Sequence, residues 1–381
     1  MAVAAERRWA WAEIDLGAVA HNVSALKALT APRTLFMAVV KADGYGHGAV
    51  DVARAALEAG ADRIGVATVD EGIRLRKAGI TSPVHILSEP PTASAAALVR
   101  YGLRPALFSP EFAAAISRAA VTAGAEVPYH LKVNTGMNRV GVEWDEAAAV
   151  ARTLRDLPGV RLEGVFTHFA TADVAGDWDF ERQLERFEKA LGEMRVSGID
   201  PGIVHAANSP ATILHPSSHF GMVRCGIAIY GLHPSESTRT KIDLRPAMSV
   251  KARVSQVRRV PMGEGVSYGL TWRAASPSVI ATLPLGYADG VGRGLSGRMR
   301  VLLGGIECQQ VGRICMDQLM VEVPRGLEVS AGDEAVIVGG QGEATLTLDE
   351  HAALLDTINY EIACGYGVRL SRRCIGTATP S

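Results

Sequence analysis

The segment LFMAVVKADGYGHGAVDVARAALEAGADRIGVATV (35–69) decides the fold class of this sequence. It starts with an apolar run (35–41), crosses a glycine-rich loop, continues with apolar residues at helical spacing (49–58) and ends in a second apolar run (63–69). Apolar strands joined by an amphipathic helix are typical of parallel sheets covered on both faces. The segment therefore predicts a strand–helix–strand unit.

The same alternation continues through the first two-thirds of the chain, with further helical spacing at 110–123 and 147–157. Strands are expected at 35–41, 63–69, 83–89, 104–108, 127–134, 160–168, 203–209 and 222–230. Eight such units predict an α/β fold, a closed (β/α)₈ TIM-type barrel over residues 13–243. An open α/β sheet with extra strands is the alternative.

The pattern changes near Leu244. Strand-like runs with glycine turns follow at 249–259, 278–285, 300–304 and 335–338, and one helix is expected at 348–362. A barrel takes ~250 residues, which leaves roughly 130 of the 381 residues for a mostly-β domain at 244–381.

The composition excludes several classes of protein. The chain has 39 Lys and Arg residues and 40 Asp and Glu residues. This balance gives no excess of positive charge of the kind that binds nucleic acid. No apolar stretch reaches the ~18 residues of a membrane helix, and no secretory signal follows Met1. The five cysteines favour a reducing compartment, so we expect a cytoplasmic protein.

Polar residues cluster where the predicted strands end, which is where barrel enzymes place their chemistry. These residues are Lys41, Lys132, Arg139, His168, His205, Asn208, Ser209, Arg224, Gly226 and Ile227. Four of them also have simpler explanations: Lys41 and Arg224 as ion-pair partners, His168 as a hydrogen-bonded core histidine, and Gly226 as a turn. His47 among glycines could indicate a metal or phosphate loop, but no metal-ligand spacing accompanies it, so no metal is expected.

Three of these features together indicate a cofactor. A lysine after a buried strand is suited to Schiff-base chemistry, and barrels often bind phosphate after their seventh and eighth strands, here near Ser209 and Gly226. A histidine such as His168 can stack on a ring. The combination points to pyridoxal 5'-phosphate.

Ten motifs in colinear order resemble those of alanine racemases. They are AEIDLGAVAHN (12–22), AVVKADGYGHGA (38–49), HLKVNTGMNRVGV (130–142), LEGVFTHFATAD (162–173), HAANS (205–209), MVRCGIAIYGL (222–232), GEGVSYG (263–269), LPLGYADG (283–290), VGRICMDQ (311–318) and TINYE (357–361). The resemblance implies a homodimeric isomerase that acts on alanine and supplies D-alanine for peptidoglycan. It also implies that residues 1–12 join the second domain.

The resemblance implies two acid–base groups. Lys41 resembles the lysine that forms the cofactor aldimine, and Tyr268, from the partner subunit, resembles the second base. His168 and Arg224 resemble the hydrogen-bonded groups behind that tyrosine, with His205 further back. Arg224 also resembles the partner of the pyridine nitrogen; because arginine only donates, it keeps that nitrogen unprotonated.

The remaining roles also follow from the resemblance. The cofactor-binding set is Lys41, Tyr45, His168, Asn208, Ser209, Arg224, Gly226, Ile227 and Tyr366. Arg139, Met316 and Tyr287 are expected at the substrate, and Tyr287, Asp173 and Arg313 in the access channel. Asp317 is expected to be structural or part of the hydrogen-bonded network, and Lys132 matches a lysine that is often carbamylated.

Two departures from the family pattern bear on the site. Val368 stands where many members have a phosphate-contacting tyrosine, and the nearest tyrosine is Tyr366. Asn134 and Asn138 replace a commoner acidic residue and glycine, which could alter how Lys132 and Arg139 are held.

Three other functions compete with alanine racemisation. The altered channel favours a racemase of broader specificity or one that prefers serine. A cofactor carrier would have a similar barrel but no second domain. A decarboxylase of related fold would need a phosphate-binding glycine motif that we do not find.

Overall fold

The computed structural model describes residues 8–174, 176 and 178–376, which form two compact units. The first unit contains residues 17–44 and 48–246. The second contains the described residues up to Leu16, Tyr45–His47 and the chain from Ala247 onward. In the described residues, we find no helix with the length and apolar character needed to cross a membrane.

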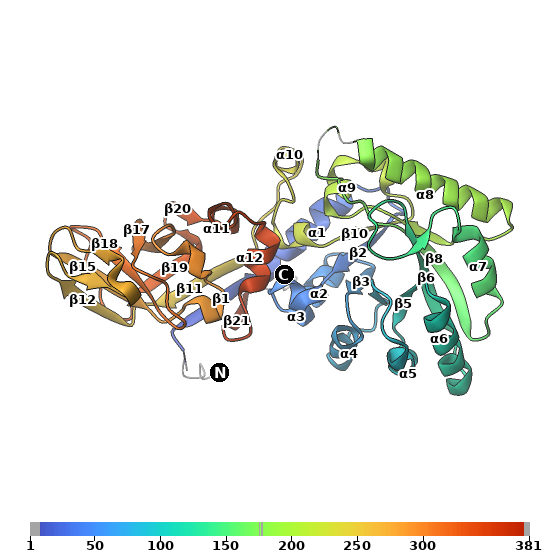
Figure 1. Ribbon diagram of the computed structural model, residues 1–381, viewed down its shortest axis with the longest axis horizontal. Coiled ribbons are helices and arrows are strands. Elements are labelled where there is room, and N and C mark those ends of the chain that lie inside the picture. Colours follow the sequence, from blue (N-terminus) through green and yellow to red (C-terminus); the bar gives the residue numbers. More distant parts are fainter. Residues whose placement is uncertain (1–7, 175, 177, 377–381) are drawn as a thin grey trace. The chain divides into compact units, whose positions relative to one another are not determined.

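The first unit is a closed parallel barrel (Figure 1). Its strands follow one another around the barrel in chain order, and β10–β2 and β5–β6 pairings leave no open edge. The strands are β2 (Leu35–Val39), β3 (Arg63–Val66), β4 (Val84–Ile86), β5 (Arg104–Leu107), β6 (Val127–Asn134), β8 (Val160–Phe166), β9 (Ile203–His205) and β10 (Met222–Cys225). This closure confirms the barrel prediction and rejects the open sheet.

The helices between the strands begin and end where the sequence carries capping residues. Ser109 caps the first turn of α6 (Pro110–Ala123), and Gly124 ends it in the left-handed conformation. Thr68 and Glu71 form a capping box at α4 (Val69–Lys77). The other barrel-unit helices are α1 (Leu16–Ala28), α3 (Ala49–Glu58), α5 (Ala95–Arg100), α7 (Ala147–Arg155), α8 (Trp178–Val196), α9 (Ser209–Leu214) and α10 (Glu236–Arg239).

Most predicted barrel strands are too long at their carboxyl ends. The expected strand 203–209 ends at His205, and Ser209 instead begins α9. The expected strand 222–230 ends at Cys225 and continues as a 3₁₀ turn, Ile227–Tyr230. Apolar residues continue into these turns because the turns are buried too, so composition does not mark where hydrogen bonding between strands stops.

The second unit is mainly a ten-stranded sheet. Its order is β12 (Gln256–Val260), β15 (Ser278–Leu283), β18 (Leu319–Val323), β17 (Ile306–Val311), β16 (Arg300–Leu303), β19 (Glu334–Gln341), β11 (Met248–Arg253), β1 (Ala10–Asp15) and β21 (Ser371–Ile375), with β20 (Ala344–Leu346) beside β19. β1 pairs antiparallel with β11 and parallel with β21. Of residues 1–12, those before Arg8 lie outside the described residues.

Two expectations for this unit were wrong in detail. The predicted strand 249–259 is two strands, β11 and β12, with a break between Arg253 and Gln256. The predicted helix 348–362 is also two elements, α11 (Leu348–Leu355) and α12 (Asn359–Gly365). Asp356 ends α11 with a left-handed φ of 55°.

Gly164 is required by close packing inside the barrel. It lies opposite His130 in the β6–β8 ladder, and a Cβ there would lie 2.7 Å from His130 Nδ1 and collide with the Ile203 carbonyl. We expect Gly164→Ala to lower the free energy of unfolding by roughly 2–4 kcal/mol. Gly192→Ala, in α8 with open space around the new Cβ, is the control and should raise it by ~0.5–1 kcal/mol. Equal effects of the two substitutions, measured by urea unfolding, would contradict this explanation.

Candidate functional site

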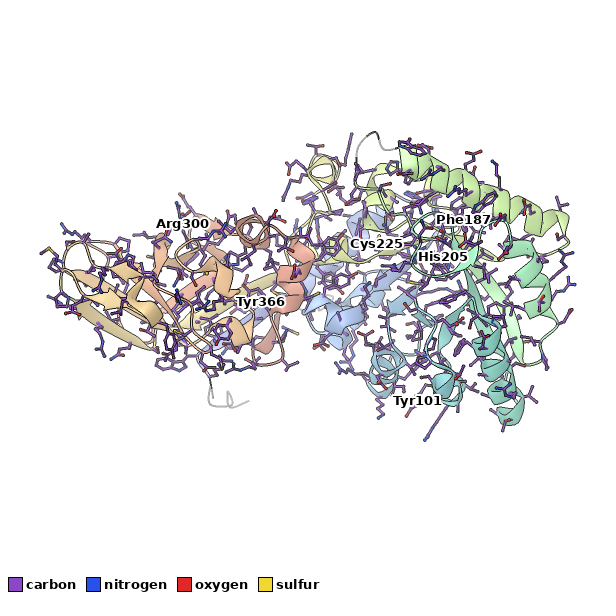
Figure 2. The ribbon with its side chains drawn as sticks, viewed as in Figure 1. Tyr101, Phe187, His205, Cys225, Arg300 and Tyr366 are labelled. Atoms are coloured by element: carbon purple, nitrogen blue, oxygen red, sulfur yellow. The ribbon has the colours of Figure 1, made fainter. Side chains whose placement is uncertain are left out.

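Arg224 is the centre of a hydrogen-bonded group inside the barrel. From β10, its Nη1 lies 3.0 Å from His205 Nδ1, and its Nη2 lies 3.1 Å from His168 Nδ1. Nη2 also donates to the carbonyls of Thr167 (2.8 Å) and Ala206 (2.9 Å). The structure thus brings together three predicted residues, His168, His205 and Arg224. Cys225, next to Arg224, and His205 are labelled in Figure 2.

The chemistry of arginine fixes the protons on both histidines. A guanidinium has only donors, so the Nδ1 atoms of His168 and His205 both accept, and each neutral ring carries its proton on Nε2. Burial and the neighbouring positive charges of Arg224, Lys132, Arg139 and Lys41 hold the pKa of His168 well below its usual range. Burial lowers the pKa of Arg224 to about 9, so it stays charged at neutral pH.

Acid is expected to destabilise this barrel early. Burial is the largest cause that lowers the pKa values of His85, His130, His168 and His205. Nearby positive charge adds to this lowering, and for His130 the hydrogen bond and charge of Glu163 oppose it. Below pH 6.5 the unfolded chain therefore binds more protons than the folded one, and stability falls as pH falls. The three histidines whose pKa lies well below its usual range, His85, His168 and His205, contribute about 1 kcal/mol each between pH 6.5 and 5.5, so the free energy of unfolding should drop by about 3 kcal/mol. Urea unfolding at both pH values measures this, and an unchanged midpoint would refute it.

Lys41, two residues after the end of β2, begins a left-handed turn. Ala42, Asp43 and Gly44 have φ of 53°, 51° and 66°, and Tyr45 has φ of 51°. Each non-glycine residue in this conformation costs about 1–2 kcal/mol, so other contacts must hold the turn. Glu71 provides one: its Oε1 accepts from the Ala42 N–H at 2.7 Å, while its Oε2 caps α4. Backbone strain of this kind is characteristic of functional sites.

Ser209 and the backbone after β10 form a polar cradle. The Gly226 N–H donates to Ser209 Oγ at 3.0 Å and the Ala228 N–H at 3.4 Å, with the Ile227 peptide between them. Ser209 is buried. Asn208 has a structural role, because its side chain caps α9 through the Ala211 N–H and donates to the Phe169 carbonyl. Its contact with a cofactor stays a prediction.

Lys132 is buried among positive charges. Burial, and then the charges of Arg224 and Arg139, hold its pKa well below its usual range. Its Nζ lies 5.0 Å from the centre of the Phe166 ring. The departures at Asn134 and Asn138 shape the loop that leads to Arg139. Asn134 Oδ1 accepts from the Asn138 N–H at 3.0 Å, and Asn138 takes the left-handed φ of 55° that a glycine would favour.

In the second unit, Tyr268 and Met316 line one open surface hollow together with Ser267, Cys315 and Asp317. The Tyr268 side chain is 71% exposed. Ser267 precedes it with a left-handed φ of 68° and donates to the Arg313 carbonyl at 2.6 Å. Asp317 forms an ion pair with Arg369 at 2.6 Å. The Tyr287 N–H donates to the Cys315 carbonyl.

Asp173, which was also expected in the access channel, lies in the barrel unit and is half-buried.

Tyr366 and Val368 differ sharply in environment. Val368 is 91% exposed, whereas Tyr366 is 1% exposed and its hydroxyl has no hydrogen-bond partner among the described residues. Figure 2 labels Tyr366 in the second unit. Burial raises the pKa of Tyr366. An unpartnered buried hydroxyl is costly, so Tyr366 is a donor that a ligand acceptor could satisfy. Tyr45 is also buried, and its ring lies 6.2 Å from that of Tyr360.

Sequence reasoning missed a set of charged and imidazole side chains deeper in the barrel. They are Arg63, His85, Arg104, His130 and Glu163. The signal was present, because His85, His130 and Glu163 interrupt strands that were expected to be buried on both faces. Buried polar groups need partners, and these residues lie too far apart in the sequence to suggest each other.

Comparisons with known proteins cover both units. The family model for the N-terminal domain of alanine racemase matches residues 14–234, and that for the C-terminal domain matches residues 247–374. The alanine racemase of Symbiobacterium thermophilum is 49% identical over 363 residues, covering 95% of this chain and 96% of that protein. The alanine racemase of Desulfovibrio desulfuricans is 48% identical over 362 residues, covering 95% of this chain and 97% of that protein.

Solved structures give the same result. The alanine racemase of Bacillus anthracis with bound L-Ala-P superposes with a TM-score of 0.93 at 37% identity, covering 98% of this chain and 97% of that one. The alanine racemase of Streptomyces lavendulae superposes with a TM-score of 0.92 at 39% identity, covering 97% of this chain and 98% of that one.

Proposed function

Because this chain belongs to the alanine racemase family, a family of isomerases, we propose that it interconverts L-alanine and D-alanine with two proton-transfer groups. One group is Lys41, and the other is Tyr268 of the partner subunit in a homodimer. Racemisation removes the α-proton from one face and returns a proton to the other. Two groups on opposite faces do this without turning the substrate over.

The observation that carries this proposal is the contact between Arg224 and His168 near Lys41. Arg224 forces the proton of His168 onto Nε2. His168 therefore has a donor to offer to a tyrosine oxygen, which favours the ionised form of that tyrosine. A tyrosine needs such help, since its ordinary pKa is about 10. This role of His168 supports the partner subunit's Tyr268 as the second base.

The residues of the barrel fit pyridoxal phosphate. When bound, this cofactor withdraws electrons from the α-carbon and makes its proton acidic. Lys41 would hold it covalently, and Arg224 would donate to its ring nitrogen. Ser209 and the peptides of Gly226 and Ile227 would bind the phosphate, a role that the contact between Ser209 and Gly226 supports. Tyr45, His168, Asn208 and Tyr366 complete the proposed set.

Arg139, the partner's Met316 and Tyr287 are proposed at the substrate and its access channel. Lys132 is proposed to be carbamylated. Only a neutral amine reacts with carbon dioxide, and the lowered pKa of Lys132 favours that form. The resulting negative charge would then be balanced by Arg139 and Arg224, whereas an unmodified lysine would repel them when protonated.

We further propose that the D-alanine formed is a peptidoglycan precursor and that the enzyme works in the cytoplasm. None of the five cysteines, all of which are described, forms a disulfide, and this supports a reducing compartment. The presence of the second unit, which contains Tyr268 and Met316, favours a racemase over a cofactor carrier, because a carrier would have no second domain.

The direct test is proton exchange at the α-carbon. Purified protein with cofactor should exchange the α-proton of both alanine enantiomers in heavy water, with matching racemisation. Cofactor absorbance without exchange of either enantiomer would refute the proposal. A higher kcat/KM for serine than for alanine in the same assay would favour the serine-preferring alternative; some turnover of serine is expected anyway, since one hydroxyl is worth only ~1–3 kcal/mol.

A further inference from the structure

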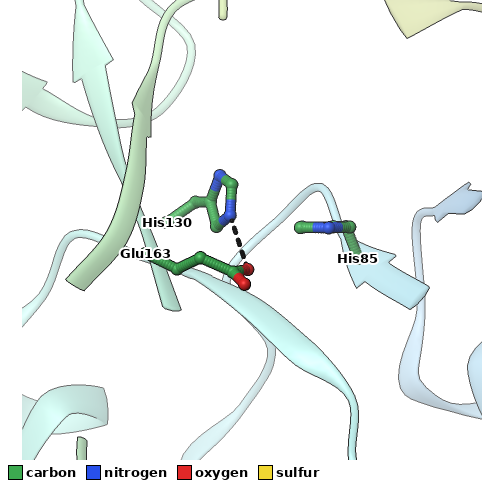
Figure 3. Close-up of side chains that lie close together, drawn as sticks. All are labelled: His85, His130 and Glu163. Carbon is green, nitrogen blue, oxygen red and sulfur yellow. Dashed lines mark hydrogen bonds and ion pairs between the residues drawn. The ribbon is translucent and has the colours of Figure 1, made fainter. Parts of the chain in front are cut away.

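A partly buried carboxylate, that of Glu163, lies at the centre of the charged cluster that sequence reasoning missed. Glu163 Oε2 lies 3.0 Å from His130 Nε2, 3.0 Å from Arg63 Nη1 and 2.9 Å from Arg104 Nε. Figure 3 shows the Glu163–His130 hydrogen bond and His85 beside it. The side chain of Glu163 is 11% exposed and that of His130 2%.

The same cluster has the residue types of a metal site, since ligand atoms of His85, His130 and Glu163 lie within 4.8 Å of one another. Two arginines argue for a different role. Arg63 and Arg104 already neutralise the carboxylate, and Arg63 Nη1 also lies 3.1 Å from His85 Nε2. A cation bound there would be repelled by both guanidinium groups. The cluster is therefore an ion-pair network.

A continuous chain of hydrogen bonds joins this network to the barrel mouth. Glu163 contacts His130, His130 Nδ1 lies 2.7 Å from His205 Nε2, His205 Nδ1 lies 3.0 Å from Arg224, and Arg224 contacts His168. Burial tends to raise the pKa of Glu163, but the hydrogen bond from His130 and the charges of Arg63 and Arg104 lower it to about 2, so it is an acceptor.

The donors in this chain can point in only one direction. Arg224 donates to His205 Nδ1, so the proton of His205 is on Nε2 and is donated to His130 Nδ1. The proton of His130 is then on Nε2 and is donated to Glu163. Each donor therefore points from Arg224 toward Glu163, and the carboxylate is the terminal acceptor.

We propose that Glu163 is a positioning residue for the reaction: as terminal acceptor it fixes the protons of His130 and His205 and thereby holds Arg224 against His168. The proposal rests on the proposed racemase function for its effect on catalysis, but not for the positions of the protons. Four residues take part between Glu163 and the reacting groups, and each comes from a different part of the barrel wall.

Replacing Glu163 by glutamine shows what the carboxylate does. If the amide nitrogen faces His130, the histidine protons move to Nδ1, and His205 Nδ1–H then opposes the Arg224 N–H at a separation of 3.0 Å. If the amide oxygen instead takes the place of Oε2, it can still accept from His130, because the contacts of His130, Arg63 and Arg104 all converge on that one atom, but the negative charge that neutralises the two arginines is lost. The first orientation sets donors against donors and frees Arg224, and the second leaves two guanidinium groups without a counter-charge beside a weaker, neutral acceptor, so neither orientation holds the chain of hydrogen bonds as the carboxylate does.

Neutron diffraction of the deuterated holoenzyme tests the proton positions directly. The expected map has deuterium on Nε2, and not on Nδ1, of His130, His168 and His205. Deuterium on Nδ1 of either His130 or His205 would overturn the proposal, whether or not the protein racemises alanine. This measurement needs no variant, so a failure of Glu163→Gln to fold leaves the test intact.

The variants test the consequence for catalysis. Glu163→Gln is expected to lower kcat/KM for alanine by roughly 10–100-fold, mainly through kcat, by analogy with the loss on removing the hydrogen-bond partner behind a metal-binding histidine. Glu163→Asp keeps an acceptor-only group and should lose less. The control is Glu126→Gln, which removes an exposed carboxylate paired with Arg161 at 2.7 Å and should retain full activity. Equal losses in Glu163→Gln and Glu163→Asp, or activity of Glu163→Gln within twofold of the control, would overturn the proposal.

Discussion

Lys41→Ala is expected to lose the absorbance of the bound cofactor and to lower turnover of alanine by more than ~10⁴-fold, the upper end for one acid–base group. Two functions disappear with one side chain, because Lys41 is proposed both to hold the cofactor and to transfer a proton. The left-handed turn that begins at Lys41 places the residue after β2 and is held by Glu71. Alanine at this position leaves the turn intact, since the turn uses the backbone of residue 42 and beyond.

The control for Lys41→Ala is Lys189→Ala. Lys189 lies on α8 and pairs with Glu185 at 2.7 Å, with its side chain 56% exposed. That variant should keep both the absorbance and the activity. Absorbance spectra and racemisation rates of the two purified proteins make the comparison. If Lys41→Ala keeps the spectrum and the rate of the control, then Lys41 has neither role.

Tyr268→Phe is expected to keep cofactor binding and to lower turnover by roughly 10²–10⁴-fold, the usual range for one acid–base group. The substitution removes only a hydroxyl from a side chain that is 71% exposed, so the second unit should fold unchanged. Tyr101→Phe, a half-buried tyrosine of the barrel unit, is the control. An unaltered rate would remove Tyr268 from the mechanism.

Mixed dimers test whether Tyr268 acts in the partner's site. Co-expressed Lys41→Ala and Tyr268→Phe chains form mixed dimers in which one site has both defects and the other has neither. With random pairing, half of the dimers are mixed and half of their sites are intact, so about a quarter of wild-type activity should return. If both bases came from the same chain, no site would be intact, and mixing would restore nothing.

The barrel could be predicted from sequence because its signal is repeated and local. Apolar runs and helical spacing alternate eight times, and the predicted strand 127–134 coincides with β6. The ends of other strands could not be predicted, since buried turns such as Ile227–Tyr230 are as apolar as the strands before them. Hydrogen bonding with strands that are distant in the sequence decides where a strand ends, and the local amino-acid composition does not reveal this bonding.

The site was predictable only in part for a similar reason. Residues at strand ends, such as His168 and Arg224, follow from the barrel rule. The left-handed conformation of Ala42 and Asp43 could not be predicted, because Ala does not favour it, Asp adopts it mainly as a single residue, and contacts with the rest of the barrel stabilise the run. Glu163 was missed because Arg63 and Arg104, which make its burial tolerable, are distant in sequence.

The position of β1 has a consequence for synthesis of the protein on the ribosome. β1 is made first, yet it pairs with β11 and with β21, which is made last. At ~5–20 residues per second, roughly 20–70 s separate the first strand from its last partner. The barrel strands are complete well before then, whereas β1 keeps one of its two edges, the one that pairs with β21, exposed until the end of synthesis. Truncation before Ser371 would leave one of those edges permanently open, and an exposed strand edge is a site of aggregation.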